Sequence, residues 1–279
     1  MRIQGKTFVV TGGGNGIGRE VVIQLLAGGA RVAALDLSQE GLDETAANAR
    51  SEKLSIHKVN IAELSQVTAS NDAIHSFHGP VDGIINVAGI IQPFVRVNEL
   101  TFDQIKKVMD VNFYGLLHVT KTYLPELISR PEAHIANVCS MGGFVPVPGQ
   151  SIYGASKAAV KLLTEGLHSE LQGTGVGVTT IFPGAIGTNI ALNSGIMNKE
   201  QMIQMASKAG AARKTTTVQD AAKAIIDGIE KKKFHVLIGQ DAKTMYFLSR
   251  LMPEAAANLI YKNTVSYTHL RAHETGRNL

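Results

Sequence analysis

Cysteine is nearly absent from this chain of 279 residues, in which Cys139 is the single example. One thiol cannot form an intramolecular disulfide, and a lack of disulfides is typical of reducing compartments. Long apolar runs are missing too, and only six residues precede the first short run, Thr7–Val10. We therefore expect no secretory leader, no membrane-spanning segment and a cytoplasmic location.

A strong excess of charge is also missing. The chain has 27 basic and 23 acidic residues, a formal net charge of +4, and no stripe of lysine and arginine with interleaved aromatic residues. This argues against a nucleic-acid partner. His269 and His273 lie four residues apart without a third ligand nearby in the sequence, so we expect no metal site.

Short apolar runs alternate with helix-length amphipathic stretches along the chain. Seven runs are expected to be strands: Thr7–Thr11, Arg31–Asp36, Leu54–Lys58, Gly83–Asn86, His134–Cys139, Gly177–Phe182 and His235–Ile238. Parallel strands need long crossover connections, so the alternation predicts a doubly wound α/β fold with a mostly parallel seven-stranded sheet and helices on both faces. We expect one domain, with ligands beyond the carboxyl ends of the strands.

A glycine-rich loop follows the first predicted strand and leads into an apolar helix. Gly12, Gly16 and Gly18, with Asn15 and Ile17 between them, would allow a tight turn and close approach to a pyrophosphate. The loop therefore predicts a dinucleotide site of the Rossmann type. A kinase-type phosphate loop would need lysine and then serine or threonine after the last glycine, and the chain has arginine and glutamate there.

Asp36 ends the second predicted strand, 18 residues beyond Gly18. An acidic side chain at this place can accept hydrogen bonds from the adenosine ribose and repel a 2′-phosphate, which predicts NAD in preference to NADP. Neither Asn15 nor Leu37 adds a positive charge. The alternative role for Asp36 is a helix cap, although Ser38 could serve equally well.

Tyr153 and Lys157 lie one helical turn apart at the start of a predicted helix. A neighbouring ammonium and an oxidised nicotinamide would stabilise the phenolate of a tyrosine, whose ordinary pKa is about 10, so Tyr153 could exchange a proton with a substrate oxygen. Ser140 follows the fifth predicted strand, where its hydroxyl could hold that oxygen. The alternative role for Ser140 is a turn or helix cap.

These motifs together resemble the short-chain dehydrogenase/reductase family over residues 1–240. The family pattern Thr-Gly-x-x-x-Gly-x-Gly falls on Thr11, Gly12, Gly16 and Gly18, and Asn-Asn-Ala-Gly falls on Asn86, Val87, Ala88 and Gly89. The resemblance implies catalytic roles for Ser140, Tyr153, Lys157 and Asn112, the last supporting a water that leads from the lysine. It also implies that Pro183, Gly184, Ile186 and Thr188 lie against the nicotinamide, that Lys157 bonds the nicotinamide ribose, and that the protein is a homodimer or homotetramer.

Two positions depart from the family pattern. Val87 replaces the second asparagine, which leaves the backbone path beside the cofactor intact. Asn60, followed by Ile61, stands where the family usually has an aspartate that contacts the adenine amino group. An asparagine oxygen accepts that hydrogen bond more weakly because it is uncharged, so cofactor affinity is the property this departure affects.

The substrate region and the carboxyl-terminal part are less strongly patterned. Residues 187–216 form a predicted lid, whose apolar residues, among them Met197, Met202, Ile203 and Met205, favour a hydrophobic substrate. We expect the substrate pocket to include Ser140, Met141, Phe144, Gln150 and Tyr153. Residues 242–261 predict one interrupted amphipathic helix or two short ones, which would cap the cleft, form an oligomer interface or, third in rank, touch a membrane.

Residues 264–279 lack apolar periodicity and are expected to be disordered. They resemble a stretch that recurs at the ends of unrelated reading frames as a cloning artefact, so the predicted domain is residues 1–263.

The sequence thus predicts an NAD-dependent oxidoreductase that interconverts a secondary alcohol and a ketone or aldehyde, on an apolar small molecule. Two alternatives stay open: a non-catalytic protein that senses NAD, and an epimerase or dehydratase on the same fold that keeps its NAD tightly bound. A hydrolase is excluded because no serine lies in a Gly-x-Ser-x-Gly motif; Ser156 follows Gly154 at the right spacing, but Ala158 stands at the second glycine.

Overall fold

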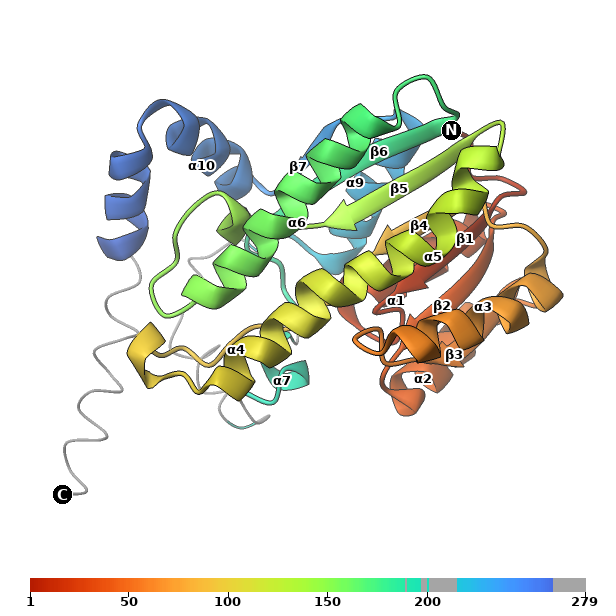
Figure 1. Cartoon of the computed structure of the whole chain (residues 1–279), viewed down its shortest axis with the longest axis horizontal. Helices are drawn as coiled ribbons and strands as arrows, with labels where there is room; N and C mark the ends of the chain where they lie inside the picture. The colour runs from red at the N-terminus through yellow and green to blue at the C-terminus, as the bar shows by residue number, and fades with distance from the viewer. Residues whose placement is uncertain (189, 197–199, 201–214, 263–279) are drawn as a thin grey trace.

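Seven strands form one parallel sheet with helices on both faces (Figure 1). The computed structural model describes residues 1–188, 190–196, 200 and 215–262. In the order β3-β2-β1-β4-β5-β6-β7, the strands are Leu54–Lys58, Arg31–Asp36, Thr7–Thr11, Gly83–Asn86, Ala133–Val138, Val176–Pro183 and His235–Ile238. The predicted doubly wound fold is confirmed. Five strands match their predicted ranges, and β5 and β6 differ from theirs by one residue at each end.

Helices and short helical turns connect the strands. They are α1 (Gly16–Ala27), α2 (Gln39–Ala49), α3 (Leu64–His78), η1 (Val97–Glu99), α4 (Phe102–Met109), the π-helical η2 (Asp110–Gly115), α5 (Leu116–Ser129), η3 (Met141–Gly143), α6 (Ser151–Glu170), α7 (Ile190–Asn193), α9 (Val218–Glu230) and α10 (Gln240–Leu251). Threonine side chains cap α4 and α9: Thr101 accepts from the Gln104 amide at 3.2 Å and Thr217 from the Asp220 amide at 3.0 Å.

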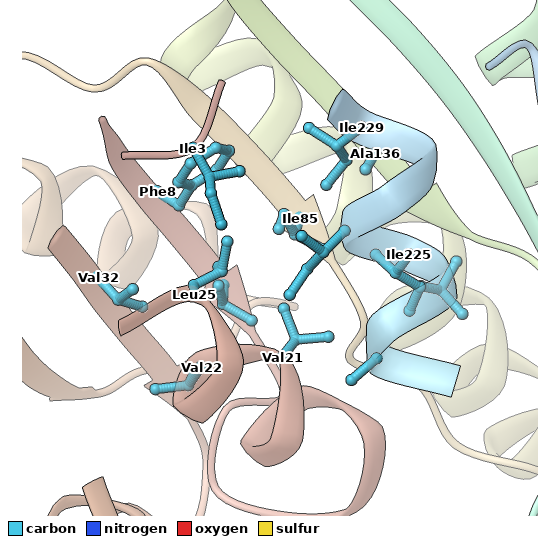
Figure 2. Close-up of a cluster of buried hydrophobic side chains, with 14 of the residues drawn as sticks. Ile3, Phe8, Val21, Val22, Leu25, Val32, Ile85, Ala136, Ile225 and Ile229 are labelled. Atoms are coloured by element: carbon cyan, nitrogen blue, oxygen red, sulfur yellow. The ribbon is translucent and has the colours of Figure 1, made fainter. Parts of the chain in front are cut away.

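The central strands β1, β4 and β5 are fully buried because both faces of the sheet are covered there, whereas the edge strand β3 is only partly buried. On one face, Phe8 of β1 and Ile85 of β4 pack against Leu25 of α1 and Ile225 of α9 (Figure 2). Val9, whose side chain points to the other side of the pleat, belongs to a second core formed with α3, α5 and α6. The two cores fix the sheet and leave the carboxyl ends of its strands free to form a site.

β1 and β4 are neighbours in the centre of the sheet although β2 and β3 lie between them in the chain. From β1 the chain crosses to β2 on one side, and from β4 it crosses to β5 on the other. The loops that follow these two strands therefore diverge, which opens a crevice at the carboxyl edge of the sheet.

The carboxyl-terminal segment forms two helices, which is one of the two arrangements expected for it. α10 ends at Leu251, and residues 253–262 are helical again. Met245 and Ala256 from these helices pack against Val145, shortly after η3.

The predicted lid methionines Met197, Met202 and Met205, with Ile203, and the predicted disordered tail 264–279 lie outside the described residues. The predicted domain boundary at 263 stays a prediction.

Asp82 ties the beginning of β1 to the end of α5. Its side chain is only 2% exposed, yet one carboxylate oxygen accepts from Arg130 Nη2 at 2.7 Å and from Lys6 Nζ at 3.4 Å, and the other accepts from the Thr7 amide at 3.0 Å. Burial alone raises the pKa of Asp82, but the Thr7 amide and the two cations outweigh it, so the net shift is downward.

Replacing Asp82 by alanine is expected to lower the free energy of unfolding by about 2 to 4 kcal/mol, because the buried amide and both cations lose their partner. A carboxyl whose pKa is lower when folded stabilises the protein above its unfolded pKa of about 3.9, and that contribution disappears as pH falls through the folded value. Urea unfolding at neutral and acidic pH measures both effects. The surface pair of Asp227 with Lys223 is the control, since Asp227→Ala should cost below about 1 kcal/mol.

Candidate active site

A cavity of about 740 Å³ occupies the crevice beyond the carboxyl ends of the strands. Most of the predicted site residues line it: Gly12, Asn15, Gly16, Ile17, Gly18, Asp36, Asn60, Ile61, Ala88, Gly89, Ser140, Tyr153, Lys157, Pro183, Gly184, Ile186 and Thr188. They come from the ends of six strands and the helices that follow, so one space connects the glycine loop to Tyr153. A volume of this size is in the range of ligand and cofactor sites.

The glycine loop keeps its backbone open toward this cavity. Gly12 has a φ of +70°, which side chains disfavour, and a Cβ there would stand 2.9 Å from the Ala88 amide nitrogen. At Gly18 a Cβ would stand 2.1 Å from the carbonyl oxygen of Gly12. Asn15, the residue before α1, makes no side-chain capping bond. The first amides of α1 are therefore left without a side-chain cap at the cavity, which fits a phosphate group.

Thr11 and Asn86, which are predicted to contact the cofactor, do not line the cavity but lie behind its wall. Thr11 Oγ1 accepts from the amides of Val87 at 3.1 Å and Ala88 at 3.2 Å. Asn86 Nδ2 donates to Asn137 Oδ1 at 2.8 Å inside the sheet. Both side chains are buried and fix the loop after β4, so their contribution to the site is to position Ala88 and its neighbours.

Asp36 and Asn60 lie at the ends of β2 and β3, beside the glycine loop. The Asp36 carboxylate accepts from the amides of Gly14 and Ser38, each at 2.9 Å, which holds its charge at the cavity wall. Ser38, not Asp36, caps α2, since its hydroxyl accepts from the Gly41 amide at 3.1 Å. Asn60 Oδ1 accepts from the Ala62 amide at 3.1 Å and keeps a second lone pair for a ligand.

Tyr153 and Ser140 meet at the other end of the cavity. Both side chains lie around Gly142, where a Cβ would stand 3.4 Å from the Tyr153 ring and 3.5 Å from Ser140 Oγ, and the Ser140 hydroxyl accepts from the Gly142 amide at 3.0 Å as the cap of η3. Burial raises the pKa of Tyr153 to about 12, an effect that the Ser140 hydroxyl partly opposes. The phenol is therefore protonated at neutral pH, and it stands where it can donate to a bound carbonyl oxygen.

Lys157 lies one turn after Tyr153 with its side chain only 3% exposed. Its Nζ donates to the carbonyl oxygen of Val138 at 3.0 Å, and a Cβ at Gly89 would come within 3.1 Å of Nζ. Burial lowers the pKa of Lys157. The ammonium thus lies against the loop of Gly89, on the cavity side of β5.

Asn112 lies in the π-helical turn η2 and is fully buried, so it does not line the cavity. Its side chain accepts from the Ile90 amide at 2.8 Å and donates to the Ile90 carbonyl at 2.9 Å and to Ser156 Oγ at 3.0 Å. Asn112 therefore joins the loop after β4 to α6, behind Lys157.

The predicted substrate residues divide into two groups. Ser140 and Tyr153 line the cavity, whereas Met141, Phe144 and Gln150 do not. Met141 and Phe144 pack into a core with the carboxyl-terminal helices, and Gln150 Nε2 donates to the carbonyl oxygen of Gln92 at 2.8 Å. A role in substrate binding therefore stays a prediction for Met141, Phe144 and Gln150.

Sequence reasoning missed several features of the site. Lys107 of α4, Asn193 and Ser194 also line the cavity, and Ser194 Oγ accepts from the Ile91 amide at 3.0 Å. Gly143 lets η3 approach α6, since a Cβ there would stand 3.0 Å from the carbonyl oxygen of Lys157. The local signal available was the pair Gly142 and Gly143, separated from Ser140 by Met141 alone.

A glycine loop at a helix start, an acidic residue at the end of β2 and a Ser–Tyr–Lys group around one cavity are the features of a dinucleotide-dependent oxidoreductase. Comparisons with known proteins agree. The model of the short-chain dehydrogenase family matches residues 6–201. The chain is 33% identical over 261 residues to SadH of Mycobacterium tuberculosis, which is named as an oxidoreductase. The matched region covers 92% of this chain and 94% of SadH.

Solved structures show the same fold. A short-chain dehydrogenase/reductase of Burkholderia phymatum in complex with NAD is 24% identical with a TM-score of 0.79, covering 90% of this chain and 94% of that one. A short-chain dehydrogenase of Burkholderia cenocepacia in complex with NADP is 25% identical with a TM-score of 0.76, covering 93% and 99%. The chain belongs to the short-chain dehydrogenase family and is an NAD(P)-dependent dehydrogenase or reductase.

Two kinds of feature are absent from the described residues. None of the helices there is long and apolar enough to cross a membrane. Across the same residues, no three side chains of histidine, cysteine, aspartate or glutamate gather as a metal site would need.

Proposed function

We propose that this protein interconverts a secondary alcohol and a ketone or aldehyde with NAD, on an apolar small-molecule substrate. The observation that carries the proposal is the juxtaposition of Ser140, Tyr153 and Lys157 in the cavity that begins at the glycine loop. When bound there, a nicotinamide supplies or accepts the hydride. The residues of the chain then need only hold the substrate oxygen and move one proton.

In the direction of reduction, Tyr153 donates its phenol proton to the carbonyl oxygen while Ser140 holds that oxygen by a hydrogen bond. The buried ammonium of Lys157 lies one turn away and stabilises the phenolate that remains. In the direction of oxidation the same residues act in reverse, and the Tyr153 phenolate is the base. Asn112 supports Lys157 by fixing the loop after β4 and the α6 helix against each other.

The proposal of an apolar substrate is supported by apolar side chains that line the cavity. Ile90, Ile91 and Ile190 line the cavity, with few charges beyond those assigned to catalysis. Burial of an apolar substrate against such side chains contributes about 25 cal/mol per Å². An apolar wall also excludes water from the proton-transfer groups.

The test is a spectroscopic assay of NAD(H) and NADP(H) with a panel of apolar secondary alcohols and ketones. Net oxidation or reduction of NAD(H) supports the proposal. Cofactor binding without turnover across the panel would favour the alternative of an NAD-sensing protein. Product formation with no net change of the cofactor would favour an epimerase or dehydratase.

Location and assembly are also part of the proposal. A buried, unpaired Cys139 is compatible with the reducing cytoplasm. Phe102, Tyr114 and Leu162 expose 87%, 48% and 69% of their surface on α4, η2 and α6. Apolar side chains that are exposed to this extent support a homodimer or homotetramer.

The preference for NAD is expected to depend on Asp36. Asp36→Asn keeps the size of the side chain but removes the charge, so the ratio of kcat/KM for NAD over NADP should fall by about 10-fold or more. Steady-state kinetics with both cofactors measures the ratio. Asp43→Asn is the matched control, because Asp43 lies on α2 outside the cavity lining and its side chain accepts from Gln39 Nε2 at 2.8 Å. An unchanged ratio in Asp36→Asn would mean that another group selects the cofactor.

A further inference from the structure

The first turn of α6, which carries Tyr153, is capped by a side chain from a distant part of the chain. Gln150, at the N-cap position, makes no side-chain capping bond. Gln92 Oε1 instead accepts from the backbone amides of Ile152 at 2.7 Å and Tyr153 at 3.0 Å. These are the second and third amides of the helix, which an N-cap side chain normally binds.

Gln92 is fixed in this role by its surroundings. Its side chain is 1% exposed, and its Nε2 donates to the carbonyl oxygen of Gly149 at 3.0 Å. Its own carbonyl oxygen accepts from Gln150 Nε2 at 2.8 Å. Because two amides face one end of the side chain and a carbonyl faces the other, only one orientation of the Gln92 amide satisfies all partners.

Gln92 also belongs to the loop that forms one wall of the cavity. Thr11 holds the beginning of this loop at Ala88, and Asn112 holds both backbone groups of Ile90. Two residues later the loop reaches Gln92 and, through it, the amide of Tyr153. The cavity wall and the start of α6 are therefore joined by hydrogen bonds at a point next to the reacting phenol.

We propose that Gln92 is a positioning residue, which sets where the Tyr153 phenol stands relative to Ser140 and the cavity wall. The inference rests on the proposed function, in which Tyr153 transfers the proton. The Tyr153 ring lies beside Gly142, at an ordinary van der Waals distance of 3.4 Å from where a Cβ on that glycine would stand. Proton transfer requires heavy atoms about 2.6 to 3.2 Å apart, so a small displacement of α6 has a large effect on rate.

Two substitutions separate the contributions of the side chain. Gln92→Met keeps its approximate size but removes the acceptor, and it should lower kcat by about 10- to 100-fold while KM for the cofactor stays within about twofold. Gln92→Glu keeps an acceptor for both amides, at a helix end that favours negative charge, but it loses the donor to the Gly149 carbonyl, so it should recover only part of the lost kcat. Steady-state kinetics of both variants, with a substrate from the panel, gives this comparison.

The control is Thr101→Ala, which removes a side-chain cap of the same kind from α4. It should match Gln92→Met in losing one helix cap, yet keep kcat within about twofold of wild type, since the cap it removes is not on the helix of Tyr153. The proposal is overturned if Gln92→Met leaves kcat within threefold of wild type, if its loss is confined to cofactor KM, or if Thr101→Ala loses as much.

A second measurement needs no substrate. Hydrogen exchange of the Ile152 and Tyr153 amides in the cofactor-free protein should be at least about 10-fold faster in Gln92→Met and unchanged in Thr101→Ala. Equal protection in Gln92→Met and wild type overturns the inference. If wild type turns over no substrate while the exchange rates behave as expected, the proposed function fails and Gln92 still positions Tyr153.

Discussion

Tyr153→Phe is expected to lower kcat by about 10²- to 10⁴-fold and to leave cofactor affinity close to that of wild type. The substitution removes only the hydroxyl, which in the proposed mechanism is the group that exchanges a proton with the substrate oxygen. The ring remains to fill its place beside Gly142 and Ser140. Steady-state kinetics together with a fluorescence titration of NADH measures the two quantities separately.

Tyr246→Phe is the matched control for this experiment. Tyr246 is a buried tyrosine whose hydroxyl lies 2.8 Å from His235 Nδ1, and it is on α10 outside the cavity lining. Its loss should change kcat by less than about twofold, although it removes the same atom. A Tyr153→Phe variant that keeps more than a tenth of wild-type kcat would show that another group transfers the proton.

The fold could be predicted from the sequence because its signals are local. A strand buried on both faces reads as a short apolar run, and seven such runs separated by helical periodicity leave few arrangements other than a doubly wound sheet. β5 ends one residue before its predicted end, at Val138, and the other three one-residue differences at β5 and β6 arise where strand pairing continues past the predicted run. Ala133 pairs with Val176 at one end, and Pro183 pairs with Ile238 at the other.

The site could be predicted only in part. A motif identifies which residue types belong to a site, but not whether each side chain lines the cavity or holds the backbone behind it. Thr11, Asn86 and Asn112 belong to motifs of the family, yet their side chains hold backbone segments and do not line the cavity. Their partners lie between 22 and 77 residues away in the chain. Contacts over such separations depend on how the elements pack, and no local pattern encodes them.

Gln92 illustrates the same limit for a residue outside every motif. Its side chain reaches a helix end 60 residues further along the chain, and nothing in the local sequence distinguishes it from a polar loop residue. The helix gives the only hint, since Gln150 is a poor substitute for the serine, threonine, aspartate or asparagine that caps most helices. A weak local cap before a functional helix indicates that a distant side chain supplies the missing acceptor.

The second large effect is expected at Gly18, where alanine should weaken cofactor binding by about 100-fold or more. A Cβ there would stand 2.1 Å from the Gly12 carbonyl oxygen and 2.6 Å from the Gly12 carbonyl carbon, and backbone atoms cannot move aside as a flexible side chain could. The glycine loop would have to shift, and a displacement of about 1 Å at a binding loop can cost two orders of magnitude. Calorimetric titration of the purified variant with NAD measures the loss.

Gly166→Ala distinguishes this clash from a general effect of placing alanine in a helix. Gly166 lies within α6 and has no atom within 4 Å of the position of a Cβ, so alanine there should stabilise the helix by up to about 1 kcal/mol and leave cofactor binding unchanged. Thermal unfolding of both variants shows whether Gly18→Ala is still folded at the temperature of the titration. If a folded Gly18→Ala protein binds NAD within threefold of wild type, the pyrophosphate does not lie on the glycine loop, and the assignment of the whole cavity to a dinucleotide has to be given up.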